Sequence, residues 1–99
     1  VPGRPFFDID QYAKKMLGTF GRFMNHSIGH GLGFDCHEFP APRKKGDFSV
    51  LEEGSVVTIE PGVYLPRRGG MRIEDDVLVP AKGPQVLTKT GKNLLVIKR

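Results

Sequence analysis

The sequence contains a single cysteine and no long run of apolar residues. A lone Cys36 cannot form an intramolecular disulfide, which is compatible with a reducing compartment. The apolar runs are only a few residues long, too short for a membrane-spanning helix or for the hydrophobic part of a secretory signal. From these absences we expect a cytoplasmic protein that does not enter the membrane.

Aromatic residues are also few, at 9% of the sequence with no tryptophan. The formal net charge is +4, but its basic clusters lack the interleaved aromatics of single-stranded nucleic-acid platforms. We expect no nucleic-acid partner, and we interpret Arg43-Lys44-Lys45 and Arg67-Arg68 as solvated loop tips. Complementation of this charge by an acidic partner segment is the alternative.

What is present is the composition of a small globular protein. The chain has 99 residues, of which 38% are hydrophobic and 26% charged. This length allows one domain with a core, but it is small for an independent enzyme.

One amphipathic helix is predicted near the start of the chain, with Asp8 as its N-cap and Gly18 and Gly21 at its end. Its apolar stripe repeats with helical spacing through Ile9, Tyr12, Ala13, Met16, Leu17 and Phe20. We expect the Met16 and Phe20 part of this stripe to lie in the core.

The second half of the chain predicts β-strands. The expected strands cover residues 55–60, 63–65, 71–79, 85–87 and 94–97, with a hairpin turn at residues 67–70. With the helix, this predicts an α+β fold, one amphipathic helix packed on an antiparallel sheet.

Strand alternation places Glu60 and Glu74 on corresponding faces of two strands that pair antiparallel around this turn. Two facing carboxylates repel unless a cation or a shared proton lies between them. The preceding segment, with Gly29 and Gly31 around His30, is flexible enough to lie over the same face. We therefore expect His30, Glu60 and Glu74 to converge, and such a mixed set favours a divalent hydrolytic metal over a thiolate-bound structural zinc.

Three motifs carry a resemblance to a known family. They are HSIGHGLG at residues 26–33 followed by HE at 37–38, TIEPGVY at 58–64, and GMRIEDDVLV at 70–79. Together they resemble the C-terminal half of the catalytic domain of the pita-bread metallopeptidases. The RIED form resembles the branch of Xaa-Pro aminopeptidases and Xaa-Pro dipeptidases (prolidases).

The resemblance implies a role for each residue of the motifs. His30, Glu60 and Glu74 would ligate two divalent ions, with Mn(II) as the first choice and Co(II) or Zn(II) as alternatives. His26 and His37 would act catalytically by binding the substrate, a peptide with proline at its second position. Arg72 would orient Glu74 from outside the ligand set.

The resemblance also implies that the ligand set in this chain is incomplete. Two further aspartate ligands and another histidine belong to the N-terminal half of the family's fold, and we expect residues 1–99 to be the C-terminal half alone. An isolated monomer should then be inactive, and a separate N-terminal half or a homodimer partner would complete the site. The alternative function is a non-catalytic pita-bread binding module or a truncated pseudo-enzyme.

Several other polar residues have simpler interpretations. We interpret Asp35, Glu38 and Asp47 as solvated or capping residues. Cys36 has no evident base or oxyanion hole beside it, so we do not expect a nucleophilic thiol.

Overall fold

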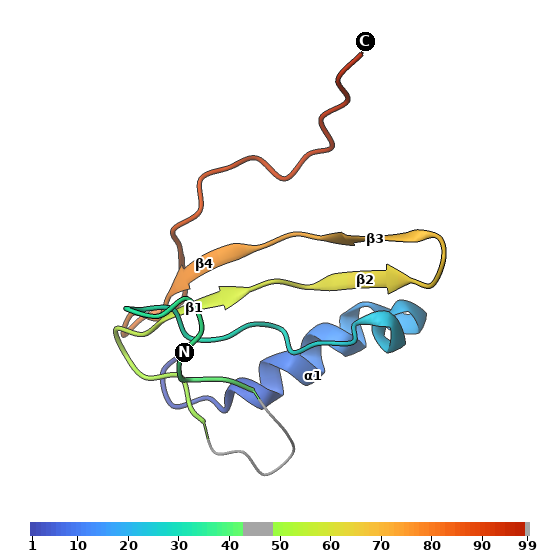
Figure 1. Cartoon of the computed structure of the whole chain (residues 1–99). Helices are drawn as coiled ribbons and strands as arrows, with labels where there is room; N and C mark the ends of the chain where they lie inside the picture. Colours follow the sequence, from blue (N-terminus) through green and yellow to red (C-terminus); the bar gives the residue numbers. More distant parts are fainter. Residues whose placement is uncertain (43–48, 99) are drawn as a thin grey trace.

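The computed structural model describes residues 1–42 and 49–98, so Asp47 and the Arg43-Lys44-Lys45 cluster lie outside the described residues. Its helical elements are α1 (Phe6–Met16) and the 3₁₀ helix η1 (Gly18–Phe23). Its strands are β1 (Val56–Ile59), β2 (Gly62–Leu65), β3 (Gly69–Arg72), β4 (Asp75–Leu78) and β5 (Gln85–Val86). The predicted α+β arrangement is confirmed, with α1 lying along the long β-hairpin (Figure 1).

The strands form one long antiparallel hairpin with a break in its middle. β1 pairs with β4, and β2 pairs with β3, while β5 adds to the outer edge of β4. Both ladders share one register, since Ile59 lies opposite Asp75 and Gly62 lies opposite Arg72. The predicted antiparallel pairing is therefore confirmed, and the common register places Glu60 opposite Glu74 at the break.

The helix begins earlier than its sequence pattern predicts. Its N-cap is Pro5, so the prediction of Asp8 as N-cap is wrong. Asp8 lies in the first turn instead, where its negative charge is favourable beside the positive end of the helix dipole. At the other end Gly18 has a φ of 57°, a conformation that glycine adopts readily.

The core is formed where the start of α1 and the loop after η1 pack on β1 and β4. Its buried apolar residues are Phe6, Met24, Ile28, Leu51, Val57, Val77 and Val79. Ile9, Ala13 and Leu17 pack partly against them. Tyr12, Met16 and Phe20 are 64%, 68% and 52% exposed, so the prediction of Met16 and Phe20 as core is wrong. The predicted stripe is wider than the face that α1 buries.

The end of the chain also differs from its predicted structure. Lys92 Nζ contacts Asp75 Oδ1 at 3.0 Å, and residues 94–97 then extend away from the sheets (Figure 1). These four apolar residues form no strand and are at least 69% exposed, so the strand predicted there is wrong. A strand needs a neighbour for its hydrogen bonds, and within the described residues this segment has none. None of the described helices is both long and apolar enough to span a membrane.

Candidate metal centre

The segment that carries the histidines lies along the free edge of β1. The amides of Thr58 and Glu60 donate to the carbonyls of His30 and Ile28 at 2.8 and 2.7 Å, and Leu32 N donates to Val56 O at 2.9 Å. Gly29 allows this approach, because a Cβ atom there would collide with the carbonyl oxygen of Thr58. The predicted placement of His30 on the hairpin is thus achieved through backbone hydrogen bonds.

His30 and Glu60 form the centre of the candidate site. His30 Nε2 lies 3.2 Å from Oε1 of Glu60, and Glu60 is 8% exposed. The other ring nitrogen of His30, Nδ1, lies 2.9 Å from the carbonyl oxygen of Gly31. A carbonyl can only accept a hydrogen bond, so Nδ1 carries a proton, and Nε2, when it carries none, is a second acceptor beside the carboxylate.

Two acceptors at this distance repel each other unless a positive charge lies between or beside them. A proton on Nε2 would satisfy the pair, and so would a divalent cation bound to both Nε2 and Oε1. Imidazole nitrogen and carboxylate oxygen are both ordinary ligands of Mn, Co and Zn. The residues present therefore fit a metal ion of the predicted type.

The carboxylate of Glu60 is held from two further directions. The Thr58 hydroxyl, which is buried, donates to Oε1 at 2.9 Å and accepts the His30 amide at 3.0 Å. Arg72 Nε lies 3.4 Å from Oε2, and the guanidinium lies 5.8 Å from the centroid of the Tyr64 ring. The structure thus places Arg72 beside Glu60, and its predicted role toward Glu74 stays a prediction.

Glu74 is not part of this close cluster. The strand register places it opposite Glu60, but its side chain is exposed. Within residues 1–42 and 49–98, no group of three or more His, Cys, Asp or Glu side chains could hold a metal ion. The structure brings together two of the three predicted ligands.

The other two histidines flank this pair. The His37 ring is exposed and lies 4.2 Å from the His30 ring, centroid to centroid. His26 packs its ring against that of Tyr64 at 5.5 Å, and its Nδ1 donates to the Ser27 carbonyl at 2.7 Å. Its Nε2 is buried and has no hydrogen-bond partner among residues 1–42 and 49–98. Their predicted catalytic roles stay predictions.

Three residues of this region were missed by sequence reasoning, namely Asp10, Thr58 and Tyr64. Asp10 is 2% exposed, and its Oδ1 accepts the amide of Ile28 at 2.8 Å. Its burial could have been predicted, because Asp10 shares a helix face with the buried Phe6 and the partly buried Ala13. Thr58 and Tyr64 lie inside a quoted motif, but nothing in their residue types separates them from ordinary strand residues.

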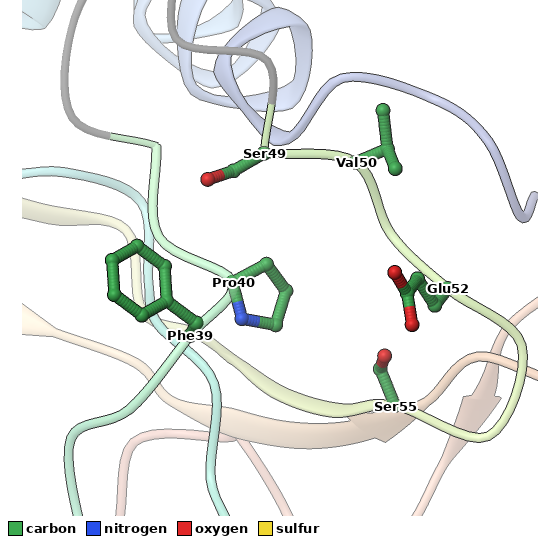
Figure 2. Close-up of a pocket in the computed structure, with 6 residues that line it drawn as sticks. All are labelled: Phe39, Pro40, Ser49, Val50, Glu52 and Ser55. Atoms are coloured by element: carbon green, nitrogen blue, oxygen red, sulfur yellow. The ribbon is translucent and has the colours of Figure 1, made fainter.

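A separate cavity of about 300 Å³ lies between the loop that follows His37 and the segment that precedes β1. Figure 2 shows Phe39 and Pro40 on one side of it and the segment from Ser49 to Ser55 on the other. Among the described residues, Glu52 is the only ionisable one in its lining, which contains none of the predicted site residues.

The site thus consists of a histidine beside the hairpin and a glutamate at its break, with a second glutamate in register, and these residue types are ordinary ligands of divalent metals. The family model of metallopeptidase family M24 matches residues 1–81, and the chain belongs to this family.

Relatives from several organisms agree with this assignment. The chain is 43% identical over 96 residues to an Xaa-Pro dipeptidase of Pyrococcus horikoshii, a match that covers 95% of the chain and 27% of that relative. It is 42% identical over 98 residues to the putative dipeptidase YkvY of Bacillus subtilis. This match covers 97% of the chain and 27% of that relative.

Solved structures agree as well. The prolidase from Pyrococcus horikoshii OT3 superposes with a TM-score of 0.86 at 43% identity, over 95% of this chain and 27% of that one. The X-Pro aminopeptidase from Thermotoga maritima superposes with a TM-score of 0.88 at 36% identity, over 97% of this chain and 28% of that one. The predicted pita-bread fold is confirmed, and the chain spans about a quarter of the length of the relatives it matches.

Proposed function

We propose that this chain forms part of the dinuclear metal site of an exopeptidase that hydrolyses the bond between an N-terminal residue and proline. The observation that carries the proposal is the 3.2 Å contact between His30 Nε2 and Oε1 of the buried Glu60 carboxylate, two atoms that are both ordinary metal ligands. Relatives named Xaa-Pro dipeptidase and X-Pro aminopeptidase support the substrate class.

Each site residue has a stated task in this proposal. His30 Nε2 and the Glu60 carboxylate would hold a divalent ion, with Glu74 from the opposite strand as a further ligand, and Mn(II) is the first choice before Co(II) or Zn(II). Divalent ions in such sites lower the pKa of water and polarise the peptide carbonyl. Thr58 and Arg72 fix the two oxygens of Glu60, and His26 and His37 would bind the peptide.

The donor set of this chain is too small for two ions, so we propose that another polypeptide segment completes it. Residues 1–99 would then act as the C-terminal half of a catalytic domain. The completing segment would be an N-terminal half of the same fold or a second copy of this chain. The match to only about a quarter of each relative supports this view. We place the assembly in the cytoplasm, on the basis of the single cysteine.

Metal content after Mn(II) loading and gel filtration, with the mass of the eluted species recorded, tests this proposal. We expect Mn(II) to be retained in a species larger than the single chain, and hydrolysis of an Xaa-Pro dipeptide by that species. Glu60→Gln and Glu74→Gln should abolish retention. Glu53→Gln, the same change at an exposed carboxylate far from the site, should not.

A metal-free single chain, with no hydrolysis in any eluted species, would exclude completion by a second copy, and the same result in the presence of an N-terminal half of the fold would contradict the proposed activity. That result would favour the second candidate, a binding module or pseudo-enzyme without catalysis. The exposed position of Glu74, outside the His30–Glu60 pair, is the observation that supports this alternative. A binding module would take up a proline-containing peptide with an affinity that a chelator does not change.

A further inference from the structure

Asp10 is a buried carboxylate to which the proposed metal site assigns no task. It lies on α1, and its side chain is 3% exposed. Removing a carboxylate from water is unfavourable unless hydrogen bonds and opposite charges compensate for the lost solvation. The contacts of Asp10 should therefore reveal why an ionisable residue occupies this core-facing position.

The two oxygens of Asp10 make different kinds of contact. Oδ2 accepts from Lys14 Nζ at 2.8 Å and from Gln11 Nε2 at 3.1 Å, both on the same helix. Oδ1 accepts from the backbone amide of Ile28 at 2.8 Å, across a separation of 18 residues. The first oxygen is thus satisfied within the helix, and the second joins the helix to the histidine segment.

Ile28 is the centre of that segment, two residues from His26 and two from His30. It is 1% exposed, and its carbonyl accepts the backbone amide of Glu60 at 2.7 Å. Its amide is therefore held by α1 and its carbonyl by residue 60. In this way the Asp10 carboxylate fixes the position of both histidines relative to Glu60.

We propose that Asp10 is a positioning residue, which holds the His26–His30 segment against Glu60 through the Ile28 amide. The proposal rests on the proposed function, because that function gives the placement of these three residues its purpose. Lys14 neutralises the buried charge and takes no part in the positioning. If Asp10 served only as the partner of Lys14, its link to Ile28 would be dispensable.

Nuclear magnetic resonance of the metal-free full chain tests this proposal with three variants. Asp10→Leu removes the acceptor at similar volume, Asp10→Asn keeps an oxygen for the Ile28 amide, and Lys14→Met removes only the ion pair. We expect Asp10→Leu to speed hydrogen exchange of the Ile28 amide by about tenfold or more relative to the β1–β4 amides. We also expect it to weaken the ring contacts of His26 with Tyr64 and of His30 with His37.

The other two variants separate positioning from general stability. Lys14→Met and Asp10→Asn should both preserve Ile28 protection and the two ring contacts, even where the whole chain becomes less stable. Unchanged protection and ring contacts in Asp10→Leu would overturn the proposal. So would a Lys14→Met variant that disturbs the histidines as much as Asp10→Leu does, or an Asp10→Asn variant that fails to preserve them.

A measurement on the unmodified chain covers the case in which Asp10→Leu does not fold. A scalar coupling through the hydrogen bond, from the Ile28 amide nitrogen to the Asp10 carboxylate carbon, is expected, and its absence would overturn the proposal. These experiments contain neither metal nor peptide. A chain that binds no Mn(II) but shows the expected pattern would contradict the proposed function and leave the role of Asp10 intact.

Discussion

Nε2 of His30 lies 3.2 Å from Oε1 of Glu60, while Nδ1 of the same ring donates to the carbonyl of Gly31. Oε1 of Glu60 also accepts from the Thr58 hydroxyl at 2.9 Å, and Arg72 Nε lies 3.4 Å from Oε2. A proton on Nε2 or a bound cation satisfies the contact with His30. The Glu60 carboxylate is therefore the common partner of three side chains.

These contacts predict that Glu60→Gln destabilises the metal-free chain. A neutral amide weakens the ion pair with Arg72, and an NH₂ group in place of Oε1 cannot accept from the Thr58 hydroxyl, so we expect a loss of about 1–3 kcal/mol. The free energy of unfolding in urea checks this expectation. Glu53→Gln is the matched control and should change stability by less than about 0.5 kcal/mol. Equal stabilities of these two variants would show that the charge of Glu60 contributes nothing to the fold.

Thr58 supports the same carboxylate, and its loss should destabilise the chain. Thr58→Val keeps the shape but removes the donor to Glu60 and the acceptor for the buried His30 amide, so we expect a cost of about 1–3 kcal/mol. Thr58→Ser should recover most of that loss because it keeps the hydroxyl. Urea unfolding gives both values, with the exposed Thr19→Val as the control. Equal stabilities of the Ser and Val variants at residue 58 would mean that the hydroxyl contributes nothing.

The antiparallel hairpin could be predicted from sequence, because alternating strands flank a glycine-rich turn. The turn lies at residues 66–68, with Leu65 opposite Gly69, and not at the predicted residues 67–70. This shorter turn places Glu60 opposite Glu74, so the exact register depends on which residues form the turn. The helix face was harder to predict. Tyr12 and Met16 belong to the same periodic stripe as Ile9 and Ala13, and only the packing on β1 shows which side is buried.

The candidate site was likewise predictable from sequence only in part. His30, Glu60 and Glu74 stand in motifs whose residue types suit a metal, so sequence alone could name them. Asp10 and Thr58 act through backbone amides of segments that are distant in sequence. Such contacts depend on the relative placement of α1, the histidine segment and β1, which no local pattern specifies.

Gly31 provides a prediction about the close approach of the histidine segment to its neighbour. A Cβ atom there would collide with the carbonyl of Phe39, which is backbone and cannot rotate away. We expect Gly31→Ala to cost about 1–3 kcal/mol and to weaken the contact between the His30 and His37 rings. Thermal unfolding and the ring contacts in NMR spectra measure the two effects. Gly91→Ala, in open space, should be neutral or slightly stabilising, and a neutral Gly31→Ala would show that the segment can shift.

The exposed side of α1 provides the last prediction. Met16 is 68% exposed, so Met16→Ala should change the free energy of unfolding by less than about 0.5 kcal/mol. Phe6 on the buried face is 0% exposed, and Phe6→Ala should cost about 3–5 kcal/mol because it leaves a cavity. Urea unfolding of the single chain at low concentration measures both changes. A loss in Met16→Ala comparable to that in Phe6→Ala would mean that this side of the helix is covered in solution, and the same measurement at several chain concentrations would show whether a second copy covers it.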